Sequence, residues 1–169
     1  MPNVIKIINK VGKEIALTLK HNDSKEYFKQ IILLYSVAEN FLKYIVATND
    51  CWEESCKQLK IRDNGGVYEV DFESLRKRIK NRYTFEKTIK VAYDKKLITE
   101  KLREQLDKLR LERNNFIHQL WILGHRNDHK YLKKTLAANT KVIKKLVKVF
   151  KWLIYEEIGV DTKAVLQIL

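Results

Sequence analysis

The chain is nearly free of the residues that interrupt helices, since only five glycines and one proline occur among its 169 residues. A sheet protein needs turn residues about every 8–12 positions, and this supply is too small for one. Apolar residues instead recur at the three- and four-residue spacing of an amphipathic helix along most of the chain. The sequence therefore predicts an all-α fold.

The apolar pattern predicts four to five long helices on short connections, which is the arrangement of an antiparallel bundle. The length and the hydrophobic content of 45% indicate one domain, residues 1–169, with a core of its own. Residues 49–70 are expected to form a short irregular excursion, because they contain the strongest turn signal, Asn64-Gly65-Gly66. Its first part, NDCWEESCKQLK at residues 49–60, can hold a short helix. We expect helices over residues 3–20, 24–48, 71–96, 100–123 and 129–158. The third starts at Asp71 or Ser74, and Thr99 is the N-cap of the fourth.

Basic residues outnumber acidic ones, 34 to 21, which gives a formal net charge of +13. Such a surplus favours a polyanionic partner, whether RNA, DNA, an anionic membrane or an acidic protein. Charged residues interrupt the N-terminal apolar stretch, so no signal segment or membrane span is expected there. We expect a soluble, cytoplasmic protein that does not associate with membranes.

Several kinds of site lack their sequence patterns. No Glu precedes a His by three residues, as in di-iron bundles, and neither a Walker-type nor a GxGxxG phosphate loop occurs. Cys51 and Cys56 have no second pair to complete a zinc site, and we expect reduced thiols. No metal or cofactor is therefore expected. The predicted helices are also too long for a helix-turn-helix reader of DNA.

The stretch LRLERNNFIHQLW, residues 109–121, places polar side chains beside the apolar stripe of the fourth predicted helix. A helix turns about 100° per residue, so Asn114 and His118 share a face, while Arg113 lies about 140° round from His118 and can reach back with its long side chain. We expect this cluster at the border of the buried stripe. Three interpretations follow from the residues: a structural polar seam between helices, a catalytic site, or another binding role.

The segment LERNNFIHQLW resembles the signature of the HEPN family of all-helical domains, whose motif is Arg, a polar residue that is often Asn, a few variable residues and then His. Arg113-Asn114-x-x-x-His118 fits that motif. The earlier segment LLYSVAENFLKYIVA resembles the family helix that brings an acidic residue near the motif, which here is Glu39. The resemblance covers about residues 24–158. It departs after the histidine, where a small residue is common in the family and this chain has Gln119.

The resemblance implies a metal-independent endoribonuclease, often a toxin or an anti-phage effector, although other members are non-catalytic modules that bind nucleotides, nucleic acid or protein partners. RNA supplies its own nucleophile, the 2′-OH. His118 would act as general acid or base, Arg113 would bind the non-bridging phosphate oxygens, Asn114 would orient the imidazole or the phosphate, and Glu39 would position Arg113.

The resemblance also implies a homodimer. Acid–base cleavage needs two proton movements, which one histidine per subunit supplies poorly, and a two-fold dimer would bring two motifs into one cleft. A toxin of this kind would have an antitoxin as a further partner, for which a small nucleotidyltransferase is a candidate.

Lysines recur on one face of the fifth predicted helix, and a second basic run, LRKRIKNRY at residues 75–83, lies within the third. Such stripes would follow an RNA backbone and make binding salt-dependent, or else form solvated faces that only aid solubility. Membrane binding would need an exposed apolar face, which a bundle buries. His125 and Arg126 are expected to contact RNA rather than to bind metal, because they lie at a predicted helix end. The candidate RNA-binding residues are Lys134, Lys141, Lys145, Lys148, Arg76, Arg78, His125 and Arg126.

Overall fold

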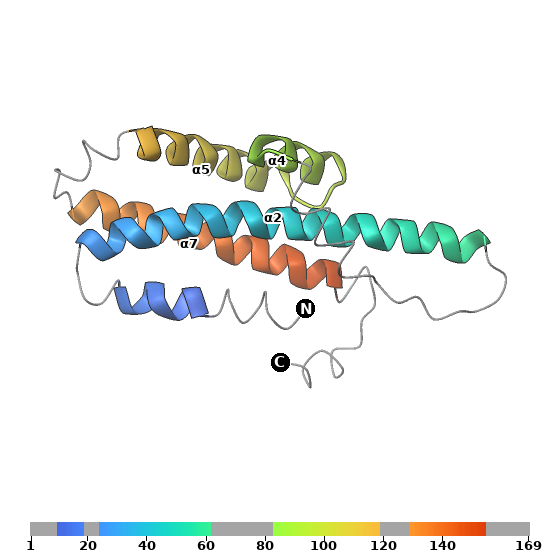
Figure 1. Ribbon diagram of the computed structural model, residues 1–169, viewed down its shortest axis with the longest axis horizontal. Coiled ribbons are helices and arrows are strands. Elements are labelled where there is room, and N and C mark those ends of the chain that lie inside the picture. Colours follow the sequence, from blue (N-terminus) through green and yellow to red (C-terminus); the bar gives the residue numbers. More distant parts are fainter. Residues whose placement is uncertain (1–9, 19–23, 62–82, 119–128, 155–169) are drawn as a thin grey trace.

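All regular secondary structure in the part of the chain that the computed structural model describes is helical (Figure 1). The described residues are 10–18, 24–61, 83–118 and 129–154. This confirms the predicted all-α bundle. Residues 10–18 contain the first helical segment, and the four longer elements are α2 (Ser24–Ile61), α4 (Phe85–Asp94), α5 (Glu100–His118) and α7 (His129–Trp152).

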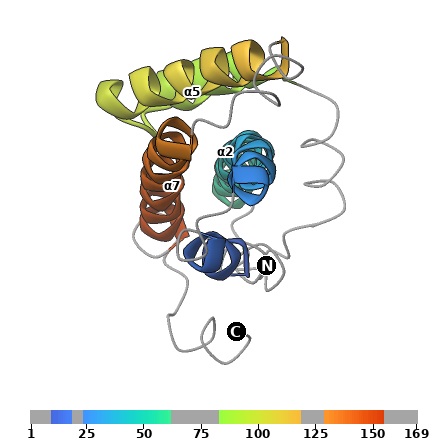
Figure 2. The same ribbon diagram turned by 90° about the vertical axis from the view of Figure 1, so that its left-hand side faces the viewer.

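The long helix α2 lies at the centre of the bundle. Viewed along its axis, it has α5 on one side, residues 10–18 on the opposite side and α7 beside it (Figure 2). Its most extensive contact is with α7. Helix α5 runs opposite to α2 and α7, whereas α2 and α7 run in the same direction (Figure 1). Helices α5 and α7, which follow each other in the described chain, are therefore antiparallel. The main packing pair, α2 and α7, is parallel.

The central place of α2 explains its composition. Because neighbours cover several of its sides, buried residues extend over a wide face and include Tyr27, Ile31, Leu34, Tyr35, Ala38, Phe41, Leu42 and Ile45. Among the described residues, its segment Glu26–Glu54 is also the one helix long and apolar enough to cross a membrane by length and composition. More than half of that segment's most apolar window is buried in the bundle, as in the core helix of a soluble protein.

The predicted irregular excursion over residues 49–70 is wrong for its first part, because α2 continues without a break to Ile61. Asn49 is buried, and its Nδ2 donates to Glu53 Oε1 over 2.7 Å, one turn further on. Lys95, from the turn after α4, also contacts this extension, with its Nζ 3.1 Å from Asp50 Oδ1 and 2.7 Å from Glu53 Oε2. These contacts hold a polar sequence in a helix. Residues 62–70 lie outside the described ranges.

The predicted helix over residues 71–96 is also not continuous. The described chain shows a new helix, α4, that starts at Phe85 after the N-cap Thr84, whose extended backbone (φ −60°, ψ 159°) breaks any helix before it. The Thr84 hydroxyl accepts a hydrogen bond from the backbone N–H of Lys87. A local cap thus outweighs the apolar periodicity across this point. Residues 71–82 lie outside the described ranges.

The turn between α4 and α5 follows two of the expected rules for helix ends. Thr99 precedes the first residue of α5, Glu100, and its hydroxyl accepts from the N–H of Leu102 over 3.4 Å, which confirms the predicted N-cap. At the end of α4, the N–H of Leu97 donates to the carbonyl of Ala92 over 2.9 Å, while Lys96 takes a positive φ of 58°. This is the left-handed helix terminus that usually has glycine.

The core predicts a clear contrast between two leucines of α5. Leu106 is fully buried and Leu111 is 53% exposed. We expect Leu106→Ala to lower the free energy of unfolding by about 2–5 kcal/mol, because it leaves a cavity. Leu111→Ala, the control, should change it by less than about 0.5 kcal/mol. Urea denaturation followed by circular dichroism measures both. Equal effects would mean that α5 packs on another face.

Candidate RNA-cleavage site

The arginine of the motif, Arg113, faces the interior of the bundle. It follows Leu106 by seven residues and Leu109 by four, so it continues the buried stripe of α5 towards the end of that helix. Its side chain keeps a relative exposure of 32%. The sequence pattern predicts a place at the border of the stripe, whereas the structure places Arg113 on the stripe, at a point where solvent still reaches the guanidinium.

Arg113 is held by an acidic residue of the central helix. Its Nη1 donates to Glu39 Oε2, and this contact joins α5 to α2. Glu39 Oε1 accepts from Lys43 Nζ over 2.7 Å, one turn further along α2. One carboxylate, with a side-chain exposure of 18%, thus binds two cations. Because the guanidinium has five N–H donors, the contact through one terminal nitrogen leaves donors that can bind a second anion.

Asn114, the second residue of the motif, is not brought to this contact. Asn114 is exposed on the outer side of α5. His118 is the last residue of α5, and its helical position is about 140° from that of Arg113. Its side chain lies outside the described part of the structure. Arg113 and Glu39 therefore meet within one chain, and Asn114 is separate from them.

Two buried polar residues beside this ion pair were not singled out from the sequence. Tyr35 lies one turn before Glu39 on α2, is 2% exposed, and contacts Phe116 of α5 with ring centroids 6.1 Å apart. Asn139 of α7 is 3% exposed. It interrupts the stripe of buried leucine, valine and isoleucine residues on α7. That interruption was the one signal that could have marked the residue.

The pKa of the Tyr35 hydroxyl is raised to about 12, mainly because the group is buried. The nearby Asn139 side chain lowers this pKa by less, and the charge of Glu112 raises it slightly. Within the described ranges, the Tyr35 hydroxyl and Asn139 Nδ2 have no well-formed hydrogen bond. Buried polar groups are almost always bonded. Two buried polar groups, those of Tyr35 and Asn139, therefore lie close together in the core, one turn along α2 from Glu39.

The lysines of α7 form the predicted stripe. Lys134, Lys141 and Lys148 are exposed, and Lys145 is half-buried because its Nζ donates to Gln105 Oε1 of α5 over 2.7 Å. The stripe therefore borders α5. Gln105 precedes Arg113 by eight residues, or about 12 Å along the helix and about 80° around it, so the stripe and the ion pair occupy different sides of α5. The other candidates, Arg76, Arg78, His125 and Arg126, lie outside the described ranges.

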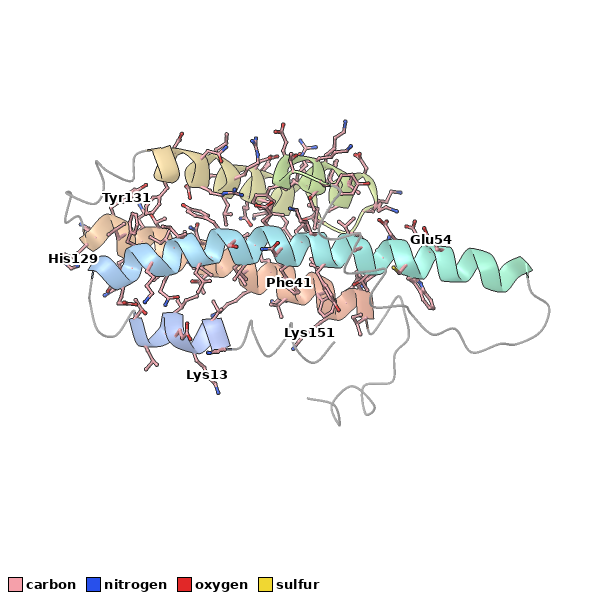
Figure 3. All side chains as sticks on the ribbon, viewed as in Figure 1. Lys13, Phe41, Glu54, His129, Tyr131 and Lys151 are labelled. Atoms are coloured by element: carbon pink, nitrogen blue, oxygen red, sulfur yellow. The ribbon has the colours of Figure 1, made fainter. Side chains whose placement is uncertain are left out.

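The acidic and histidine residues within the described ranges do not form an evident metal site. Among the residues that the structure describes, no three His, Cys, Asp or Glu side chains are grouped as metal ligands. His129 lies at the start of α7, at the same end of the bundle as Tyr131 (Figure 3). Its ring is 6.4 Å from that of Tyr27 in an edge-to-face contact.

Comparisons with protein-family models, with curated proteins and with solved structures found no match to this chain.

Because Glu39 binds both Arg113 and Lys43, we expect its removal to destabilise the protein more than the removal of Arg113 does. Glu39→Ala leaves both Arg113 and Lys43 without their common partner, and we expect the free energy of unfolding to fall by about 1–3 kcal/mol. Arg113→Ala should cost no more than about 1 kcal/mol, because Glu39 keeps its contact with Lys43. Glu104→Ala, an exposed carboxylate on α5, is the control. If Arg113→Ala were the more damaging change, the pair would be mainly a packing contact.

Tyr35 predicts a specific loss of stability at alkaline pH. The folded protein keeps its proton until about pH 12, whereas the unfolded chain releases it near 10.0. The contribution is fully present below pH 10 and is lost as the pH rises to about 12, up to about 2–3 kcal/mol in total. Tyr35→Phe should remove this loss and change neutral stability by less than about 1 kcal/mol. Urea denaturation near pH 9 and near pH 11.5 measures it, and parallel curves for both proteins would contradict it.

Proposed function

We propose that this protein is a metal-independent endoribonuclease of the HEPN type. The observation that supports it most is the pairing of Arg113 with Glu39 across α5 and α2. The resemblance implies that an acidic residue of an earlier helix, here Glu39, lies near the motif arginine, and the contact between the two side chains supports the proposal. The net charge of +13 is consistent with an RNA substrate.

In the proposed reaction the 2′-OH of the substrate attacks the adjacent phosphorus, and the bond to the 5′-oxygen breaks. Arg113 binds the non-bridging oxygens, where negative charge develops, through the N–H donors that Glu39 does not occupy. Glu39 fixes the guanidinium, so that little freedom is lost when the phosphate binds. His118 takes the proton from the 2′-OH or gives one to the leaving oxygen. The product ends in a 2′,3′-cyclic phosphate or its hydrolysed form.

The angle between Arg113 and His118 supports a dimer for this chemistry. Positions about 140° apart on one helix do not face a single phosphate directly. A two-fold axis near the end of α5 would place the His118 of one protomer beside the Arg113 of the other. It would also supply the two histidines that two proton movements need. In such a dimer the exposed Asn114 would lie at the interface, where it can orient a phosphate or an imidazole.

The rival function is a non-catalytic helical module that binds nucleic acid, nucleotide or a protein. An ion pair between two packed helices is also a common structural contact. In that interpretation Arg113 only holds α5 on α2. A toxin role would add an antitoxin partner, for which a small nucleotidyltransferase stays the candidate. The two functions differ in whether RNA is cut.

The test is cleavage of single-stranded RNA in EDTA by the purified protein. We expect Arg113→Ala and His118→Ala each to lower the rate at least about 10²-fold, with an unchanged helical signal. Arg110→Ala and His129→Ala are matched controls: Arg110 lies one turn earlier on α5 and pairs with Glu86 and Asp107, and His129 begins α7. Neither should reduce the rate.

A substrate with 2′-deoxyribose at the scissile position should bind and remain uncut. Its cleavage, or full activity of His118→Ala, would overturn the mechanism. Light scattering at micromolar concentration should show a dimer, and a strict monomer would contradict the two-histidine scheme. A protein that binds RNA and leaves it intact in every condition would favour the non-catalytic module.

A further inference from the structure

A cavity of about 730 Å³ lies at the far end of α5 from the motif. It is bordered by the turn between α4 and α5 and by the last turns of α7, and it is open to solvent. Apolar side chains form much of its lining, including Leu97 and Val149. From Thr99, which lines it, to Arg113 is 14 residues, or about 21 Å along the helix. The cavity is therefore separate from the Glu39–Arg113 pair.

A tryptophan stands at this cavity at the end of the lysine stripe. Trp152 lines it, is 37% exposed, and follows Lys148 by four residues and Lys145 by seven. At that spacing the three residues share one side of α7. The stripe thus runs along α7 and ends in an indole. Basic side chains that lead to an accessible aromatic ring are what single-stranded nucleic acid binds, by phosphate contact and by base stacking.

A second lysine reaches the cavity from the opposite wall. Lys96 lines it and has a positive φ of 58°, at the helix terminus where glycine avoids the strain that a side chain causes. This lysine therefore takes a costly backbone conformation at the edge of the cavity. Asp94 is the acidic residue of the lining, so two lysines face one carboxylate there.

Two other polar groups of the lining, those of Tyr93 and Thr99, already have partners. The Tyr93 hydroxyl bonds to Glu100, which is the main cause that raises its pKa. Its ring lies 4.6 Å from the guanidinium carbon of Arg103. The Thr99 hydroxyl caps α5. Trp152, Lys96 and Lys148 are the groups of the lining with an aromatic face or a positive charge to offer a ligand.

We propose that this cavity binds a nucleobase together with its phosphate. Trp152 stacks on the base, Leu97 and Val149 form the apolar floor, and Lys148 and Lys96 bind the phosphate. This ligand chemistry occurs in single-stranded RNA and in free nucleotides. The inference relies on the proposed function only for the expectation that RNA is bound, since it involves no group of the cleavage reaction. A membrane fits less well, because the site is concave and the apolar face of α7 is buried.

The test is the affinity of a short 2′-O-methyl oligoribonucleotide, which cannot be cleaved by its own 2′-oxygen, measured by fluorescence anisotropy. We expect Trp152→Ala to weaken binding by about 5- to 150-fold, the usual effect of removing one stacking ring. Trp152→Phe should retain most of the affinity. Trp52→Ala, which removes a tryptophan outside the cavity, should change nothing. Unchanged affinity in Trp152→Ala would overturn the proposal.

A charge reversal gives an independent test. Lys148→Glu should weaken binding and reduce its dependence on salt, whereas Lys144→Glu makes the same change one turn earlier on α7, outside the cavity, and should have a smaller effect. Equal effects of the two would overturn the proposal, because net charge alone would then explain the binding.

Further measurements separate the ligand sources and the two proposals. If adenosine or uridine monophosphate saturates the protein and Trp152→Ala abolishes that binding, the cavity binds free nucleotides. If Trp152→Ala abolishes only oligonucleotide binding, the cavity binds RNA. Both outcomes support the inference. Binding to anionic vesicles that depends on Trp152, with oligonucleotide binding intact, would overturn it. Arg113→Ala should bind the oligonucleotide in a Trp152-dependent way. We expect that result even if the protein cuts no RNA. Failure of the proposed ribonuclease function can therefore be distinguished from failure of the proposed binding site.

Discussion

The packing of α2 against its neighbours is the constraint on which the rest of the structure depends. Because this helix is covered on several sides, nearly every position between Tyr27 and Asn49 that faces inward must be apolar or paired. Glu39 is the charged exception in that stretch that reaches across to another helix. Its contacts with Lys43 and Arg113 offset the cost of placing a carboxylate so near the core, and they fix where the end of α5 lies over α2.

The same contact links stability to chemistry. An arginine that solvent alone surrounds loses side-chain freedom when it binds a phosphate. Arg113 has already lost much of that freedom through Glu39, and the polar interior around Tyr35 and Asn139 adjoins it. The second anion-binding site, which we infer at Trp152, lies at the other end of α5. Both ends of one helix are therefore bordered by cationic groups, with the lysines of α7 along its flank.

Much of the fold could be predicted from local patterns. The scarcity of glycine and proline and the apolar spacing indicated the helices, and Thr99 marked the start of α5 because capping is decided within a few residues. The errors came from contacts that are distant in sequence or from competing local rules. Residues 49–61 look polar and irregular, yet Lys95 binds Asp50 and Glu53 and keeps α2 helical. Thr84 ended a periodic stretch that apolar spacing alone would have continued.

The candidate site could be predicted only in part, because some of its contacts join residues that are distant in the sequence. The pairing of Glu39 with Arg113 followed from the resemblance of two segments, whereas the spacing of residues alone left Arg113 at the edge of the stripe. Tyr35 could not be recognised, because a tyrosine on an apolar face is ordinary until its neighbours are known. Trp152 does not stand out in the sequence, because the lysine pattern before it indicates charge and gives no sign that the next ring borders a cavity.

The parallel course of α2 and α7 has a consequence for how the molecule can form. Helices that follow each other in the chain pair as hairpins, with little entropy lost in closing the short loop between them. The main packing pair here is instead closed by the chain between Ile61 and His129, which carries α4 and α5. Pairing over such a separation slows folding. During synthesis, α2 would leave the ribosome with much of its apolar surface uncovered and stay so until α7 follows, an interval in which a chaperone or a bound partner has access to the future core.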